Sequence, residues 1–182
     1  MTIAISVIGK DRPGIIAALA GTLYRSGGNL EDASMTILEG EFAMIFLADV
    51  KSKTGHQRLI RELRRMEAAL KLVISIREIK HRLVRGEKHR RGTTPWVISV
   101  LGKDRAGIVY SVSKTIADEE LNITDLNSKI IGSGQKATYA LILEVDIPSK
   151  KGLVEHLRRK FEGLEQRLKV KIRLNPLDPV KF

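Results

Sequence analysis

The residues of this chain that could do chemistry are concentrated in one loop motif that occurs twice. Residues 9–15 read Gly-Lys-Asp-Arg-Pro-Gly-Ile, and residues 102–108 read Gly-Lys-Asp-Arg-Ala-Gly-Ile. Each motif follows alternating apolar residues and precedes apolar residues at helical spacing, so we expect each to join a strand to a helix. The unpaired N–H groups of the helix's first turn would then face the loop, where they can bind an anion such as a carboxylate.

The side chains of the motif extend this prediction from an anion to an amino acid. Gly14 and Gly107 have no Cβ, so a small ligand could approach the backbone closely there. Asp11 and Asp104 could accept hydrogen bonds from an ammonium group. A site that captures both a carboxylate and an ammonium group suits a free α-amino acid, provided that a further polar group lies across the groove.

Asn29 and Asn122, at the entry to the predicted second strand of each copy, are the candidates for that polar group. A purely structural interpretation stays open for each feature. The loop could be a tight turn in which Asp11 and Asp104 cap the helix and Pro13 fills its first position. The two asparagines could likewise occupy a left-handed turn at the helix exit.

The repeated loop belongs to a duplication of the whole chain. At an offset of 93, residues 5–15 and 98–108 are identical at nine of eleven positions. Four extra residues near 133–136 then move the offset to 97. A period of this length is too long for a solenoid unit, so each copy should be a complete domain. We therefore predict domains at 1–79 and 95–175, a linker at 80–94 and a tail at 176–182.

Within each copy the hydrophobic period alternates between two and 3.6, which predicts the order βαββαβ. Right-handed crossovers fold this order into a four-stranded antiparallel sheet with both helices on one face, the ferredoxin-like arrangement of the α+β class. Residues 42–48 are apolar on both sides of their predicted strand. We therefore expect the helix-free side of that sheet to pack against another domain or subunit.

Several classes of protein are excluded by composition and spacing. The chain has no cysteine, and no two of its four histidines lie four residues apart, so we expect neither a metal nor another cofactor. It offers no paired histidine and nucleophile and no phosphate-loop motif, which argues against an enzyme. No apolar run approaches the length of a membrane span, and the N-terminus does not read as a signal peptide, so we expect a cytoplasmic protein.

The net charge of +11 and the pI near 10.0 raise a nucleic-acid alternative. Residues 80–94 alone carry six Lys and Arg against one Glu. That segment could contact phosphates through residues 80–92. It has no aromatic residue for stacking on bases and no recognition helix, so we favour a solvated basic linker and expect no nucleic-acid partner.

The loop motif, followed by Gly28-Asn29-Leu30, resembles the signature of ACT domains, which are regulatory modules that bind amino acids. Two copies without an attached enzyme resemble the glycine-cleavage-system transcriptional repressor family. The resemblance implies pairing of domains and an effector held where the glycine loop of one domain faces the second strand of another. Carried over by position, it implies these ligand-facing residues: Asp11, Gly14, Ile15 and Asn29 in the first copy, and Asp104, Gly107, Ile108 and Asn122 in the second.

The sequence thus predicts a non-enzymatic regulatory protein that binds a small amino acid and signals through changed domain or partner contacts. Regulation of amino-acid metabolism or of transcription, through a partner regulatory protein, is the expected setting. A homodimer is our default, because symmetric pairs are the commonest oligomers. In the second copy Glu119-Glu120-Leu121 replaces Ser26-Gly27-Gly28. The added negative charge there disfavours a carboxylate ligand, so we expect the first site to be the better one.

Overall fold

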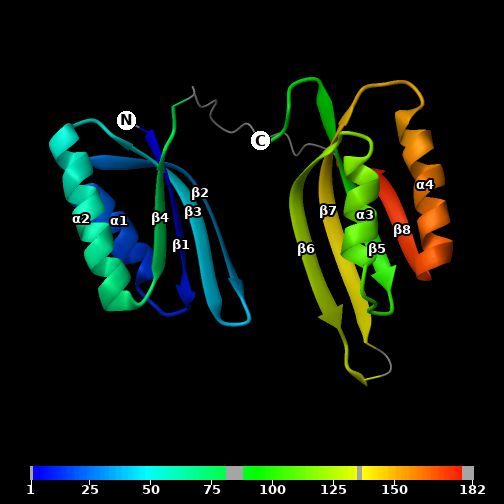
Figure 1. Ribbon diagram of the computed structural model, residues 1–182, viewed down its shortest axis with the longest axis horizontal. Coiled ribbons are helices and arrows are strands. Elements are labelled where there is room, and N and C mark those ends of the chain that lie inside the picture. The colour runs from blue at the N-terminus through cyan, green and yellow to red at the C-terminus, as the bar shows by residue number, and fades with distance from the viewer. Residues whose placement is uncertain (1, 81–87, 135–136, 178–182) are drawn as a thin grey trace. The chain divides into compact units, whose positions relative to one another are not determined.

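The structure is a computed structural model that describes residues 2–80, 88–134 and 137–177. The chain divides into two compact units, residues 1–86 and 87–182, each with the order βαββαβ (Figure 1). The first unit contains β1 (Thr2–Lys10), α1 (Ile15–Arg25), β2 (Gly28–Leu38), β3 (Glu41–Val50), α2 (Lys53–Leu70) and β4 (Val73–Glu78). The second contains β5 (Thr93–Gly102), α3 (Ile108–Ala117), β6 (Asn122–Ile131), β7 (Thr138–Pro148), α4 (Leu153–Leu168) and β8 (Val170–Pro176).

Each unit holds one four-stranded antiparallel sheet. The strand orders are β2-β3-β1-β4 and β6-β7-β5-β8, so the first strand of each unit lies in the middle of its sheet. The ferredoxin-like arrangement predicted from the sequence is therefore confirmed in both copies. Residues 81–87 of the predicted linker and residues 178–182 of the predicted tail lie outside the described residues.

One face of each sheet is covered by both helices of its unit. In the first unit the core joins β1 and β3 to apolar residues of α1 and α2, among them Leu19 and Leu63. Residues of β3 at even positions are buried, while those at odd positions are half-buried or exposed. Ile45, on the helix-free face, is 52% exposed within its unit. What covers this face therefore stays a prediction.

The second strand of each unit carries an irregularity at the same place. The pairing register shifts between Leu30 and Asp32 in β2, and between Ile123 and Asp125 in β6. One residue in each strand is therefore extra relative to β3 or β7, as in a β-bulge.

No helix within the described ranges is both long enough and apolar enough to cross a bilayer.

Candidate functional site

The two glycine loops have the same backbone conformation. Gly14 lies directly before α1 with φ of 94°, and Gly107 lies directly before α3 with φ of 91°. Only glycine adopts this left-handed conformation without steric cost, so both positions require glycine for the turn itself. A Cβ placed on either glycine would meet nothing within 4 Å, so the space beside both loops is open within each unit.

The structure corrects two predictions about how these helices begin. Neither helix has a side-chain cap, and Gly14 and Gly107 occupy the cap positions, so the capping role considered for Asp11 and Asp104 is wrong. Pro13 precedes the cap and does not fill the first helical position. The reason is that the chain reverses at the left-handed glycine, which places the helix start one residue after it.

The uncapped helix starts leave donors for a ligand. The first intrahelical bond of α1 runs from Ala18 N–H to Gly14 O, at 2.9 Å, and that of α3 runs from Ser111 N–H to Gly107 O, also at 2.9 Å. The N–H groups of the residues between these partners precede the helical ladder and have no side-chain cap. The N-terminal end of a helix also carries partial positive charge, which favours an anion.

The remaining residues of the first loop are fixed by the backbone around them. Asp11 is exposed, and its N–H donates to Gly40 O at 2.8 Å, which ties the loop to the turn between β2 and β3. The guanidinium of Arg12 donates to Leu70 O at the end of α2. Ile15 is buried in the core of its unit, so only its backbone N–H could meet a ligand. Ile108 is buried in the same way in the second unit.

The asparagines lie far from the glycine loop of their own unit. Asn29 pairs with Asp49, as does Thr2 at the start of β1, whereas the loop follows Lys10 at the other end of that strand. At about 3.3 Å per residue, the length of β1 separates the two groups by roughly 25 Å. In the second unit Asn122 and Pro95 both pair with Asp146, so the arrangement is the same. A site that uses both groups must therefore take them from two domains.

The alternative role of the asparagines in a left-handed turn is wrong. Asn29 and Asn122 are the first or second residues of β2 and β6, and the left-handed residues are Gly27, with φ of 68°, and Glu120, with φ of 56°. The side-chain amide of Asn29 donates to Glu31 Oε1 at 3.1 Å. The helix exit thus takes its left-handed residue two positions before the asparagine.

One acid of the second copy's acidic pair, Glu119, is paired with cations of the same unit. Glu119 Oε1 lies 2.5 Å from Lys160 Nζ and 3.1 Å from His156 Nε2, both on α4. The hydrogen bond from Lys160 holds the pKa of Glu119 below its ordinary value, with smaller contributions from His156. Its charge is therefore offset locally, which weakens the argument that it repels a ligand.

Part of the predicted basic linker is held by acids of the second unit. Asp146, only 2% exposed, accepts from the N–H of Arg90 at 2.9 Å and lies 2.7 Å from Nδ1 of His89. Lys88 pairs with Glu144, which raises the pKa of its ammonium group. Lys88 and Arg90 are exposed, as the prediction of a solvated linker requires, but residues 88–90 are also bound to the second unit. The alternating acids on β7 were the signal for this contact.

The comparison with known families decides what these two units are. The sequence profile of the ACT domain matches residues 1–77 and 94–175, which together make up most of the chain. The chain belongs to the ACT domain family. The predicted tandem ACT organisation is confirmed, and each matched range coincides with one βαββαβ unit.

Relatives of these ACT domains each match about half of the chain. A UPF0237 protein of Pyrobaculum aerophilum is 31% identical over 86 residues, which are 47% of this chain and 91% of that protein. A UPF0237 protein of Clostridium perfringens is 33% identical over 90 residues, covering 50% of this chain and 99% of that protein. These relatives therefore have the length of a single ACT domain.

Two solved structures match both ACT domains together. An "unknown protein" from Galdieria sulphuraria has a TM-score of 0.77 at 25% identity and covers 97% of this chain and 98% of its own. A structure described as a candidate glycine cleavage system transcriptional repressor has a TM-score of 0.69 at 19% identity, with 98% of both chains covered. At that identity the second likeness shows the fold alone.

Proposed function

We propose that this chain is a non-enzymatic regulatory protein whose ACT domains bind a small amino acid. The glycine loop of one domain would hold the ligand's carboxylate on the helix-start N–H groups, while Asp11 or Asp104 would face its ammonium group. Asn29 or Asn122 of a second domain would complete the site. Signalling would run through the contacts between domains or with a partner regulatory protein, in amino-acid metabolism or transcription.

The observation that carries this proposal is the open, uncapped helix start behind a left-handed glycine, found in both ACT domains. Gly14 and Gly107 leave free space where a side chain would stand, and no side chain among the described residues caps the helix starts behind them. A buried or capped loop would have supported a purely structural turn. The ligand and the second domain are part of the proposal.

The roughly 25 Å between loop and asparagine gives the site a way to signal. A ligand held by groups of two domains binds only the arrangement that brings them together. It therefore stabilises that arrangement by its differential affinity, and no further mechanism is needed for a regulatory output. A homodimer would supply such a second domain as readily as the other half of the chain.

Isothermal titration of the full chain against the twenty amino acids tests the proposal. The variant Gly14→Asn should lose binding at the first site, because its side chain would occupy the space of the ligand. Asparagine is the substitution of choice, since it tolerates the left-handed conformation better than other side chains. Size-exclusion chromatography with the bound amino acid should also show whether the oligomeric state changes.

Gly152→Asn is the matched control. Gly152 caps α4 with φ of 81°, has no side-chain cap and has open space beside it, as Gly14 does. Both variants therefore carry the same backbone strain at a helix start, and only Gly14→Asn should change amino-acid binding. If no amino acid binds at millimolar concentration, or if both variants bind like the unaltered chain, the proposed site is refuted.

A further inference from the structure

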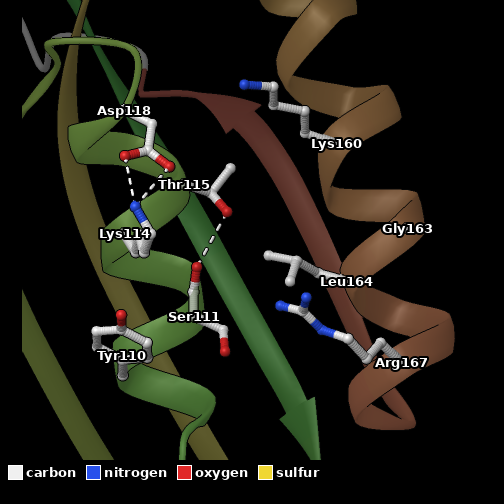
Figure 2. Close-up of a pocket in the computed structure, with 9 residues that line it drawn as sticks. All are labelled: Tyr110, Ser111, Lys114, Thr115, Asp118, Lys160, Gly163, Leu164 and Arg167. Atoms are coloured by element: carbon white, nitrogen blue, oxygen red, sulfur yellow. Dashed lines mark hydrogen bonds and ion pairs between the residues drawn. The ribbon is translucent and has the colours of Figure 1, made fainter.

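A second open site lies in the C-terminal ACT domain, between its two helices. The groove between α3 and α4 has a volume of about 570 Å³, within the range of small-molecule sites. Figure 2 shows that polar groups from both helices line it. Tyr110, Ser111 and Thr115 contribute hydroxyl groups from α3, and Lys114 joins them from the same helix. This groove is separate from the glycine loops of the proposed amino-acid site.

Three cations reach this groove against one acid that lines it. Lys160 and Arg167 extend from α4 toward α3 (Figure 2). Lys114, on α3, pairs with Asp118 at 2.8 Å, and Lys160 pairs with Glu119 beyond the groove. Arg167 has no hydrogen bond or ion pair with any residue in the described ranges. The Lys114–Asp118 pair is exposed, and exposed ion pairs are worth at most about 1 kcal/mol, so Lys114 can turn to a bound anion at little cost.

The floor of the groove leaves room for a ligand. Gly163 lies on α4 between Lys160 and Arg167, and a Cβ added there would meet nothing within 4 Å. Tyr110 is 68% exposed, so its ring offers an apolar surface at one end of the groove. An organic group attached to an anion could therefore pack on this ring while the anion meets the cations.

The first ACT domain shows that the helix pair does not need these polar groups for packing. The duplication places Ala17, Ala18 and Gly21 of α1 where α3 has Tyr110, Ser111 and Lys114. The same fold thus packs with two alanines and a glycine in place of two hydroxyl groups and an ammonium group.

The second helix of each pair, α2 in the first domain and α4 in the second, also differs in charge between the two domains. Glu67 accepts from Ile74 N–H and Glu165 accepts from Ile172 N–H, so these glutamates are equivalent positions. From them, Glu62 corresponds to Lys160 and Ala69 to Arg167. The first domain therefore has an acid and an alanine where the second has two cations. Lys114, Lys160 and Arg167 are therefore cations that the first domain lacks at the equivalent positions.

We propose that the α3–α4 groove binds the phosphate group of a small phosphorylated molecule. A phosphate monoester carries about −1.5 to −2 charges at neutral pH, which matches convergent cations better than one carboxylate does. The planar guanidinium of Arg167 can donate two parallel hydrogen bonds to phosphate oxygens. Lys114 and Lys160 would add point charges, and the free hydroxyl of Ser111 would add a donor.

Titration of the full chain with adenosine 5′-monophosphate, ribose 5-phosphate, inorganic phosphate and adenosine tests this site. The three phosphates should bind, and adenosine should not. Arg167→Gln should weaken phosphate binding at least about tenfold, because it removes a charge-assisted hydrogen bond. Amide NMR shifts on adding adenosine 5′-monophosphate should be concentrated at Ser111, Thr115 and Gly163.

Arg159→Gln is the charge-matched control, because Arg159 is an exposed base of α4 that does not line the groove. It should leave phosphate binding within about twofold, since surface charges at a distance are screened by salt. Equal weakening by Arg159→Gln and Arg167→Gln would mean that only the net charge attracts phosphate, and would overturn the proposal. Failure of every phosphate to bind at millimolar concentration would overturn it too, as would binding to polynucleotides alone.

A second pair of variants tests the groove itself without risk to the fold. Gly163→Glu places a carboxylate between the cations and should abolish phosphate binding, whereas Gly163→Ala should retain it. Both replacements raise helix propensity at a position with open space, so α4 should stay folded. Equal phosphate binding by the two variants would show that the phosphate binds elsewhere. Amino-acid binding at the glycine loops should be unchanged in both, which separates this site from the proposed function.

Discussion

The two ACT domains keep nearly the same glycine loop but brace the opposite end of the helix that follows it by different means. In the first domain the corner between α1 and α2 is closed by direct backbone contact. A Cβ on Gly55 would lie 2.3 Å from Ser26 O, and one on Gly28 would lie 2.4 Å from Leu23 Cδ1. In the second domain Glu119 replaces Ser26 and reaches Lys160 and His156 on α4.

This difference shows which part of the duplicated unit tolerates change. A close-packed glycine corner and an ion-paired corner hold the same helices on the same sheet. The left-handed glycine before α1 and α3 has the same φ, within a few degrees, in both copies. The loop is therefore the same in both copies and the corner at the far end of the helix is the variable element, which is the pattern expected if the loop serves a ligand and the corner serves stability.

The largest expected effect is a loss of stability confined to the first domain. Gly55→Ala forces a Cβ into the backbone oxygen of Ser26, and overpacking of this kind costs about 3 kcal/mol. Thermal unfolding should then show the transition of the N-terminal domain at a lower temperature. The transition of the C-terminal domain should not move.

Gly163→Ala is the counterpart in the second domain and should act in the opposite direction. Its Cβ meets open space in the middle of α4, so the free energy of unfolding of that domain should rise by about 0.5–1 kcal/mol. If Gly55→Ala were as harmless as Gly163→Ala, the corner of the first domain would not be close-packed, and the comparison between the two supports would fail.

A smaller loss is expected where the second domain holds the preceding segment. Asp146→Asn removes the charge of a buried carboxylate that accepts from Arg90 N–H and contacts His89. The free energy of unfolding of the second domain should fall by about 2 kcal/mol in this variant, and amide exchange at Arg90 should become faster. Asp125→Asn is the control, since this exposed acid lies 3.6 Å from Lys88 and should have little effect. Similar effects from both would show that residues 88–90 are not held by Asp146.

The smallest effect is a pH dependence of the ion-paired corner. The folded pKa of Glu119 is below its ordinary value of 4.5, chiefly through Lys160, so the pair stabilises the folded state when pH is above that value. The contribution is lost as pH falls through the folded pKa. The melting temperature of the second domain in Glu119→Gln should thus lie below that of the unaltered chain at neutral pH, and the two should converge in acid.

Glu162→Gln supplies the comparison for that titration. Glu162 is exposed on α4 and has no ion pair within the described part of the chain, so its variant should follow the unaltered chain at every pH. A constant difference between Glu119→Gln and the unaltered chain across the pH range would show that the corner is held by packing and not by charge.

Much of the fold could be predicted because the duplication repeats the hydrophobic pattern of every helix and strand. The alternation of residues 3, 5 and 7, and the helical spacing of Ile15, Leu19 and Leu23, are dictated by which side chains are buried, and those residues are buried. The start of α1 could not be predicted in the same way. Asp11, Pro13 and Gly14 are all acceptable at a helix start, and the left-handed φ of Gly14 decides between them only once the chain direction is set.

The candidate sites were predictable only in part, for a related reason. The glycine loop is one continuous segment, so its geometry is local. The second half of the proposed amino-acid site requires another domain, and no sequence pattern gives the position of that domain. The α3–α4 groove was missed because Lys114, Lys160 and Arg167 are bases on amphipathic helices, where such residues ordinarily face water. Only the convergence of two helices, and the contrast with Gly21 and Ala69 in the first domain, distinguishes them.

The single extra residue in β2 and in β6 decides what the helix-free surface of each sheet can offer to a neighbour. Because side chains alternate between the two faces of a regular strand, one inserted residue turns every side chain on its N-terminal side to the other face. A regular strand could not hold this extra residue without turning Asn29 toward the helices, whereas the bulge absorbs it and keeps Asn29 beside Asp49 on the outer surface. Removing Glu31 at the irregularity should therefore straighten β2 and leave Asn29 on the same surface.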